Sequence, residues 1–197
     1  MTAVALRRRA LALPAWCRLL WLDYRRYRAE GHGALRTVFL TQGFWAIAVY
    51  RLSRALIGAA RPGFAQTLAK SLAGVAQKGV EILTGIAIPR TCEIGGGLYI
   101  PRFGGIILSH GPIGENCTIE HCVTIGSLTK GGERGYPTIG DRVHIGAQSI
   151  IVGKVTIGDD AVISPGSFVT RSVPAGAVVA GNPARVVSQP GRDSRGL

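Results

Sequence analysis

Aliphatic residues recur at a spacing of six through most of the second half of the chain. The series is Ile94, Ile100, Ile106, Ile113, Ile119, Ile125, Ile139, Ile145, Ile151, Ile157, Ile163 and Val169. No α-helix keeps such a period, whereas a chain that turns a corner after each short strand points one aliphatic side chain inward per turn. The spacing predicts a coil in which three six-residue units complete one triangular turn.

The repeat is interrupted twice. One extra residue falls between Ile106 and Ile113, and two extra residues fall within 126–138. We expect residues 127–138, which are rich in glycine and charge, to leave the coil as a loop that shapes a site. A β-sandwich would need alternation of period two and hairpin turns, and neither runs through this segment.

The first half of the chain has a different composition. Residues 1–90 contain 14 lysines and arginines against three acidic residues, whereas residues 91–197 contain nine against eight. Apolar residues at three- and four-residue steps predict helices over 11–28, 44–57 and 64–83, separated by turns at Gly31–Gly33 and Pro62-Gly63. We therefore expect a basic helical domain over 1–85, the repeat domain over 86–187 and a loose tail over 188–197.

The basic front end suggests two kinds of partner. The helix expected at 11–28 carries Trp16, Tyr24 and Tyr27 beside arginines. This pattern suits an anionic membrane surface, or packing of the helices on one another or on a second subunit. No nucleic-acid-binding motif accompanies the charge, so we expect no nucleic acid partner. No run approaches the about 20 apolar residues needed to span a bilayer. We expect a cytoplasmic protein, with peripheral contact at the inner face of the membrane left open.

The cysteines do not form a recognisable framework. They are Cys17, Cys92, Cys117 and Cys122, with no Cys-x-x-Cys pair and no zinc-finger spacing. We expect neither a disulfide framework nor a metal. Cys117 and Cys122 suit small buried positions or the lining of a groove.

Several motifs narrow the fold to a family. The runs Ile94-Gly-Gly-Gly-Leu-Tyr-Ile100, Ile113-Gly-Glu-Asn-Cys117 and Val123-Thr-Ile-Gly126, with the ending at 173–185, resemble the serine acetyltransferase branch of the hexapeptide-repeat acyltransferases. The resemblance implies a mainly β fold, a left-handed parallel β-helix after the small helical domain. It also implies acetyl-CoA bound between neighbouring β-helices of a homotrimer, and direct transfer of acetyl to a hydroxyl. Whether trimers pair into hexamers stays open.

The chain departs from this family at the residues that carry the chemistry. The family's catalytic histidine falls on Arg102, and its orienting aspartate falls near Ala87. Arginine stays protonated and cannot act as a base. In the family's Arg-His-Pro motif the histidine binds serine, and in this chain that histidine falls on Gly135 or Tyr136. We expect Arg134 and Tyr136 to bind the acceptor.

Another histidine is a candidate for the missing base. Three repeats plus the inserted residue place Ile119 over Ile100, and hence His121 over Arg102, in coils about 4.8 Å apart. We expect His121 to take the proton and Arg102 to supply positive charge for an oxyanion or a CoA phosphate. An outward-facing histidine with no role is the alternative. His110, just before the inserted residue, is the second candidate.

Two more histidines complete the set. His144 is expected at a coil corner, facing a neighbouring subunit, and His32 is expected in solvent. Zinc-binding carbonic anhydrases share the fold, but their ligand spacing is not matched here, which favours no metal.

Small residues and two arginines are the candidate cofactor site. The family pattern puts the pantetheine arm of acetyl-CoA beside Gly126, Ala147, Ser149 and Ser167, where large side chains would block the groove. Arg171 and Arg185 are expected to meet the phosphate oxygens.

The sequence therefore predicts an acetyl-CoA-dependent O-acetyltransferase. Its acceptor is serine, which would feed cysteine synthesis, or a sugar hydroxyl of an exopolysaccharide. Two rivals remain: a catalytically inactive β-helix scaffold, and a docking module whose working part is the basic helices.

Overall fold

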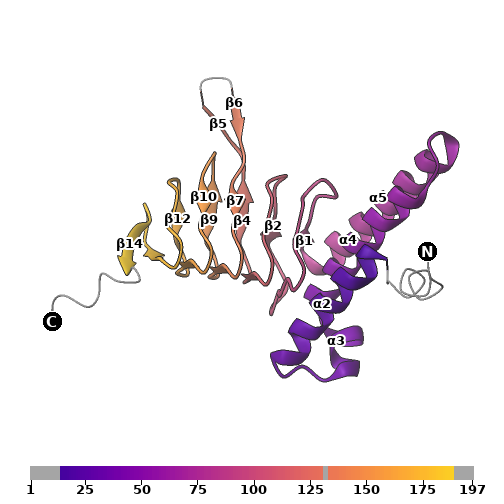
Figure 1. Ribbon diagram of the computed structural model, residues 1–197, viewed down its shortest axis with the longest axis horizontal. Helices are drawn as coiled ribbons and strands as arrows, with labels where there is room; N and C mark the ends of the chain where they lie inside the picture. Colours follow the sequence, from indigo (N-terminus) through magenta and orange to yellow (C-terminus); the bar gives the residue numbers. More distant parts are fainter. Residues whose placement is uncertain (1–13, 131–132, 189–197) are drawn as a thin grey trace, which may run out of the picture.

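A computed structural model describes residues 14–130 and 133–188, as a triangular coil with helices gathered at one end (Figure 1). The helices are α2 (Ala15–Ala29), α3 (Ala34–Leu40), α4 (Gln42–Ala59) and α5 (Phe64–Thr84). The strands are β1 (Ile86–Ala87), β2 (Ile106–Ile107), β3 (Thr118–Ile119), β4 (Thr124–Gly126), β5 (Leu128–Lys130), β6 (Glu133–Gly135), β7 (Thr138–Ile139), β8 (His144–Ile145), β9 (Ile150–Val152), β10 (Thr156–Ile157), β11 (Val162–Ile163), β12 (Phe168–Val169), β13 (Val178–Ala180) and β14 (Arg185–Ser188).

The short strands stack into the faces of a prism. One face has the order β1-β2-β4-β9-β12 and another the order β14-β13-β11-β8-β3, with β7 and β10 on the third face. Pairing between successive coils is parallel, and Ile119, Ile145 and Ile163 stack in register. Every aliphatic residue of the six-residue series is buried. The prediction of a left-handed β-helix after N-terminal helices is confirmed.

The first interruption of the repeat lies elsewhere than predicted. Ile107 pairs with Thr124, so Leu108, and not Ile106, stacks with Ile125. The corner after Ile100 uses five residues, 101–105, where the corner after Ile119 uses three. The prediction of one extra residue between Ile106 and Ile113 was therefore wrong. The sequence could not show this, because Ile106 and Leu108 are both aliphatic and either could be the residue that stacks in the ladder.

The longer corner also changes what lies under His121. The amide of Cys122 donates to the carbonyl of Gly104 at 2.9 Å, which sets His121 opposite Gly104 in the lower coil. The predicted stacking of His121 directly over Arg102 was therefore wrong. The two extra residues let Arg102 project from the corner instead.

The second interruption forms a hairpin. β5 and β6 pair in antiparallel fashion and project from the prism (Figure 1). This confirms that the stretch leaves the coil, and it identifies the excursion as a two-stranded ribbon.

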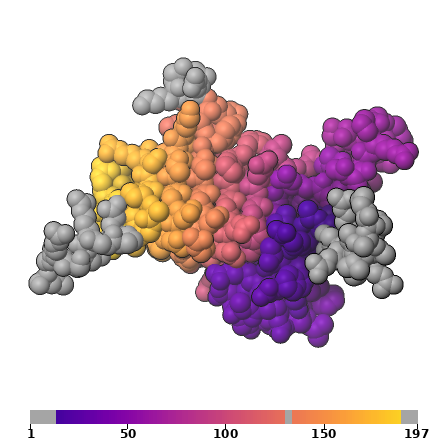
Figure 2. All heavy atoms as spheres, in the orientation of Figure 1, coloured from indigo at the N-terminus to yellow at the C-terminus, as the bar shows by residue number. Residues whose placement is uncertain are grey.

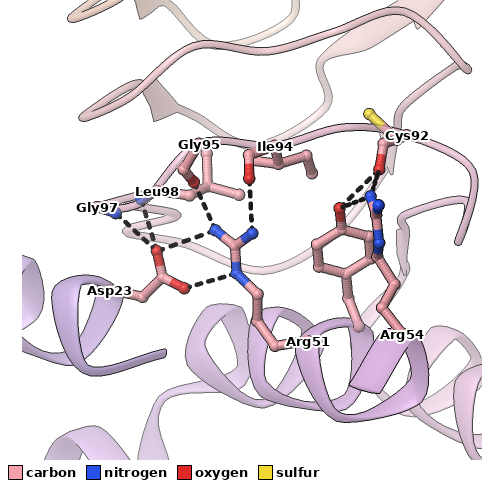
Figure 3. Close-up of polar contacts among 9 residues, drawn as sticks. Asp23, Arg51, Arg54, Cys92, Ile94, Gly95, Gly97 and Leu98 are labelled. Carbon is pink, nitrogen blue, oxygen red and sulfur yellow. Dashed lines mark hydrogen bonds and ion pairs between the residues drawn. The ribbon is translucent and has the colours of Figure 1, made fainter. Parts of the chain in front are cut away.

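The helices dock on the first coil through a buried ion pair (Figure 3). Asp23 of α2 accepts hydrogen bonds from Arg51 of α4 and from the backbone amides of Gly97 and Leu98. Arg51 also donates to the carbonyl oxygen of Ile94 at 2.6 Å. Burial raises the pKa of Asp23, and the opposing effect of Arg51 and the amides does not fully cancel that shift. These bonds satisfy backbone groups that the first coil leaves without a neighbouring coil.

The helix α5 buries its small residues and exposes its large apolar ones, the reverse of what is expected for an amphipathic helix. Its buried positions are the small residues Ala69, Ala73 and Thr84, whereas Phe64, Leu72 and Val75 are exposed. With α4 it forms an arm that extends beyond the prism (Figures 1 and 2).

The three expected helices correspond to α2, α4 and α5, and α3 was not predicted. Residues 11–13 of the first expected helix, and residues 189–197 of the expected tail, lie outside the described residues. Across residues 14–130 and 133–188, no helix has the length and apolar character to cross a bilayer.

Candidate active site

A cleft of about 450 Å³ separates the helices from the corner after Ile100. We call it the histidine cleft. Its lining residues come from the segment between α2 and α4, from the start of α4 and from the first two coils: His32, Arg36, Leu40, Thr41, Gln42, Gly43, Pro101, Arg102, Phe103 and His121. It brings together Arg102 and His121, the pair predicted from the sequence, although their backbones are not in register.

Local packing fixes the corner that carries Arg102. Tyr27 donates its hydroxyl proton to the carbonyl of Ile100 at 2.9 Å and accepts from the Ile100 amide at 3.1 Å. Gly43 lies so close that an added Cβ would be 2.3 Å from the Ile100 oxygen. A larger residue there would force α4 away from the corner.

The two histidines of the cleft each have a ring nitrogen without a partner. The Nδ1 atoms of His32 and His121 are both buried and form no hydrogen bond within the described chain. His32 Nε2 lies 3.1 Å from the hydroxyl of Tyr99, and its ring packs edge-on to Tyr27. The prediction that His32 lies in solvent was wrong, since contacts across 67 residues of sequence bring it into the cleft.

The charge of the histidine cleft is positive. Arg36 and Arg102 line it, and none of its lining residues is acidic. In the described part of the chain, no carboxylate forms an ion pair with either arginine. A larger cleft of about 580 Å³ contains Arg51 and Arg54, but these already donate to backbone carbonyls. The histidine cleft is therefore the better site for an external ligand.

A second cleft of about 360 Å³ lies across Pro101 and Arg102, which line both. We call it the Glu120 cleft. Glu120 Oε1 lies 3.4 Å from His144 Nε2, and Oε2 accepts from the Ala147 amide at 3.2 Å. A carboxylate beside an imidazole can orient it for proton transfer. Glu120 was not predicted from the sequence, where its one signal is its place just before His121.

The second candidate base, His110, lies at a different corner. Its Nδ1 is hydrogen-bonded to the hydroxyl of Thr91, and it lines a cleft against α5. Its ring meets Tyr136 edge-on at 5.5 Å between centroids. Arg134 is exposed on β6. Within one chain, His110, Arg134 and Tyr136 do not reach the histidine cleft.

Comparison with known proteins agrees with the fold. Residues 136–171 match the family described as bacterial transferase hexapeptide (six repeats). The serine acetyltransferase of Helicobacter pylori (strain 26695) is 32% identical over 153 residues, which cover 77% of this chain and 85% of that enzyme. The chain belongs to the serine acetyltransferase family. The resemblance seen in the sequence is thus confirmed.

Other family members match over similar lengths. The Mycobacterium tuberculosis serine acetyltransferase is 34% identical over 157 residues, and this chain spans 65% of its length. The crystal structure of the Neisseria gonorrhoeae serine acetyltransferase in complex with serine has a TM-score of 0.76 at 30% identity, covering 92% of this chain and 72% of that one. A Brucella abortus serine acetyltransferase in complex with coenzyme A has a TM-score of 0.77 at 28% identity, covering 89% and 69%.

The candidate cofactor residues of this serine acetyltransferase family member fall into three groups. Ser149 and Ser167 turn their side chains into the coil, where both hydroxyls donate to the carbonyl of Ser164. Gly126 and Ala147 are half-buried, so their backbones remain at the surface.

Arg171 and Arg185 line one cleft of about 190 Å³ near β14. Two exposed guanidiniums in one cleft suit phosphate oxygens. Among the described residues, no group of acidic, cysteine or histidine side chains could hold a metal ion.

Proposed function

We propose that this protein is an acetyl-CoA-dependent O-acetyltransferase whose acceptor binds in the histidine cleft. The observation that carries the proposal is the meeting of His121 and Arg102 at the corner where the family resemblance puts a catalytic histidine. The His121 imidazole, whose Nδ1 has no hydrogen-bond partner among the described residues, supports a base role. Arg102 supports a charge-stabilising role.

The reaction is a direct transfer. The His121 imidazole accepts the proton of the acceptor hydroxyl as its oxygen attacks the thioester carbonyl. Arg102 stabilises the oxyanion of the tetrahedral intermediate. Collapse of the intermediate breaks the carbon–sulfur bond, and the imidazolium returns the proton to the CoA thiolate. The products are an acetyl ester and free CoA, with no covalent enzyme intermediate.

The test is release of CoA thiol from acetyl-CoA with serine and then with a panel of sugars. His121→Asn should lower kcat by about 10²- to 10⁴-fold, the range for loss of a general base. His110→Asn removes the second candidate base and should stay near wild type; loss of turnover in this variant alone would make His110 the base. If His144→Asn abolishes turnover while His121→Asn does not, the base is the histidine of the Glu120 cleft. No thiol with any acceptor would favour the scaffold alternative.

The acceptor is serine or a saccharide. The absence of the serine-holding histidine at Gly135 and Tyr136 favours a saccharide, and the overall similarity to serine acetyltransferases favours serine. The acceptor panel decides between them.

We also propose a homotrimer that binds acetyl-CoA between neighbouring prisms. Exposed Ile107 and Ile150 on the β1-β2-β4-β9-β12 face support it, since apolar prism faces favour a partner. Sedimentation equilibrium should give three times the 20.8 kDa chain mass, or six times if trimers pair.

A further part of the proposal is peripheral contact with the inner face of an anionic membrane. The outer face of α5 exposes Phe64, Leu68, Leu72, Val75, Ile82 and Leu83. Residues 14–90 supply 11 basic against three acidic side chains, which complements anionic lipid. Amphipathic helices of this kind lie in the membrane interface.

Vesicle flotation tests this contact. Wild type should float with vesicles that contain phosphatidylglycerol and stay behind with pure phosphatidylcholine. Phe64→Ser combined with Leu72→Ser should abolish flotation, whereas the exposed Val187→Ser should not. A change in trimer mass in the double variant would assign the α5 face to subunit packing instead.

A further inference from the structure

We infer that the acceptor carries an oxyanion group, a carboxylate or a phosphate, which Arg36 and Arg102 bind in the histidine cleft. The inference rests on the proposed acetyl transfer and adds the chemical class of its acceptor. It follows from charge, from hydrogen-bonding capacity and from the way the cleft is assembled.

The cleft holds two permanent positive charges that no described carboxylate balances. Guanidinium groups remain protonated at any physiological pH. The two acidic residues of the neighbouring Glu120 cleft already have partners, because Glu30 pairs with Arg26 at 3.1 Å and Glu120 contacts His144. Arg36 and Arg102 therefore have no internal counterion among the described residues.

Arg51 of the helical segment has a structural role, and its surroundings differ from those of Arg36 and Arg102. Arg51 is 3% exposed and bonded to Asp23 and to two backbone carbonyls. Arg36 and Arg102 are exposed, and neither guanidinium has such bonds to the residues that the structure describes. Their guanidinium donors face a cleft and remain available.

The two arginines reach the cleft from different elements. Arg36 comes from α3, and Arg102 comes from the corner that the two extra residues enlarge. Planar guanidiniums match carboxylate and phosphate oxygens in bidentate fashion. An oxyanion held between them would join the helices to the first coil.

Such binding also directs the acceptor. His121 lines the same cleft, so an oxyanion on the arginines leaves a nearby hydroxyl of the same molecule to face the imidazole. An anionic acceptor gains charge-assisted hydrogen bonds from the two guanidiniums, whereas a neutral acceptor gains only ordinary hydrogen bonds, which are about half as strong. The cleft therefore selects anionic over neutral hydroxyl compounds.

Matched acceptor pairs test the inference through release of CoA thiol. The pairs are glycerate against glyceramide, glucuronate against glucose, and glucose 1-phosphate against glucose. At least one anionic member should exceed its neutral partner by about 10- to 100-fold in kcat/KM, the range for one charge-assisted hydrogen bond. The carboxylate and phosphate pairs show which oxyanion is preferred.

Variants assign the preference to this cleft. Arg36→Gln should raise KM for the anionic member by about tenfold or more and leave its neutral partner unchanged. Arg102→Gln should lower turnover of both members, because Arg102 also stabilises the oxyanion of the reaction. Arg61→Gln, in the turn between α4 and α5, is the matched control and should change neither.

A binding experiment separates this inference from the proposed reaction. The chain has four histidines, so their imidazole proton signals can be assigned by substitution and followed by NMR while inorganic phosphate is added. The signals of His32 and His121 should shift, that of His110 should not, and Arg36→Gln should abolish the shifts. Phosphate binding without thiol release would refute the reaction and keep the oxyanion site. Thiol release with equal use of both members of every pair would overturn the inference.

Discussion

Tyr27 connects the helices to the corner that carries Arg102 through a single hydroxyl. That hydroxyl both donates to and accepts from the backbone of Ile100, one residue before the corner that carries Arg102. Burial raises the pKa of Tyr27 well above its usual range, so the donor proton is retained. Tyr27 is a positioning residue, since it lines neither cleft yet fixes the strand from which Arg102 projects.

We predict that Tyr27→Phe lowers the free energy of unfolding by about 1–3 kcal/mol, because the amide and carbonyl of Ile100 stay buried without a partner. It should also lower kcat/KM at 25 °C, where the variant is still folded. Tyr24→Phe, whose ring packs against Phe44, is the control and should be near neutral. Urea unfolding and thiol release measure the two effects. Wild-type stability in Tyr27→Phe would contradict this role.

At the residue scale, the sequence predicted only part of the site. Counting repeats brought Arg102 and His121 to one corner because both belong to the coil, although the register that it gave was wrong. His32 and Arg36 could not be placed in this way, because their positions depend on how α2 and α3 pack on the first coil. Glu120 lies in the coil directly before His121, so the same count could have placed it. A linear pattern has no period that links residue 32 to residue 121.

Among the elements, the docking of α2 and α4 on the first coil depends on one buried charge pair. Asp23 and Arg51 are 0% and 3% exposed and bind four backbone groups of residues 94–98 between them. Removing one partner leaves the other charge buried and unpaired, which costs far more than the pair contributes.

We predict that Asp23→Asn and Arg51→Met each lower the free energy of unfolding by about 3–5 kcal/mol. The Asp23→Leu, Arg51→Met double variant should lose less than the sum of the two, because no lone charge remains. Urea midpoints at one protein concentration measure this, with the exposed pair Arg142→Gln, Asp160→Asn as the control. Single variants within 0.5 kcal/mol of wild type would refute it.

The ladder followed from the six-residue period, and the helical front end from apolar residues at three- and four-residue steps, because both depend on local spacing. It did not predict which corner holds the extra residues, since Ile106 and Leu108 fit the ladder equally well. Nor did it predict that α5 turns small residues inward and large apolar residues outward. Helical periodicity identifies the apolar face of a helix, but it does not show whether that face packs inside the molecule or is exposed.

For the whole molecule, the coil interior is one continuous apolar column that includes two thiols. Cys92 and Cys117 are fully buried, and burial raises the pKa of each thiol to about 11. The folded and the unfolded chain both keep these thiol protons at neutral pH, so the thiols add no pH dependence to the free energy of unfolding there. Above pH 9 the unfolded chain loses them while the folded chain retains them until about pH 11.

We predict that the free energy of unfolding falls as pH rises from 9 to 11, by up to about 1.4 kcal/mol per pH unit for each thiol. Cys92→Ala and Cys117→Ala should each reduce that slope, and the exposed Cys122→Ala should not. Denaturant titrations at several pH values give the slopes. Equal slopes in all three variants would show that other groups govern alkaline stability.

Because each turn of the prism repeats the one below it, the molecule can be lengthened without redesign. A duplicated turn inserted beyond the third would preserve every ladder, the helical covering at one end and the antiparallel closure by β14 at the other. Of the prism, the histidine cleft uses only the first two turns, so it would not be disturbed. Evolution could thus vary molecular length and acceptor choice as independent traits.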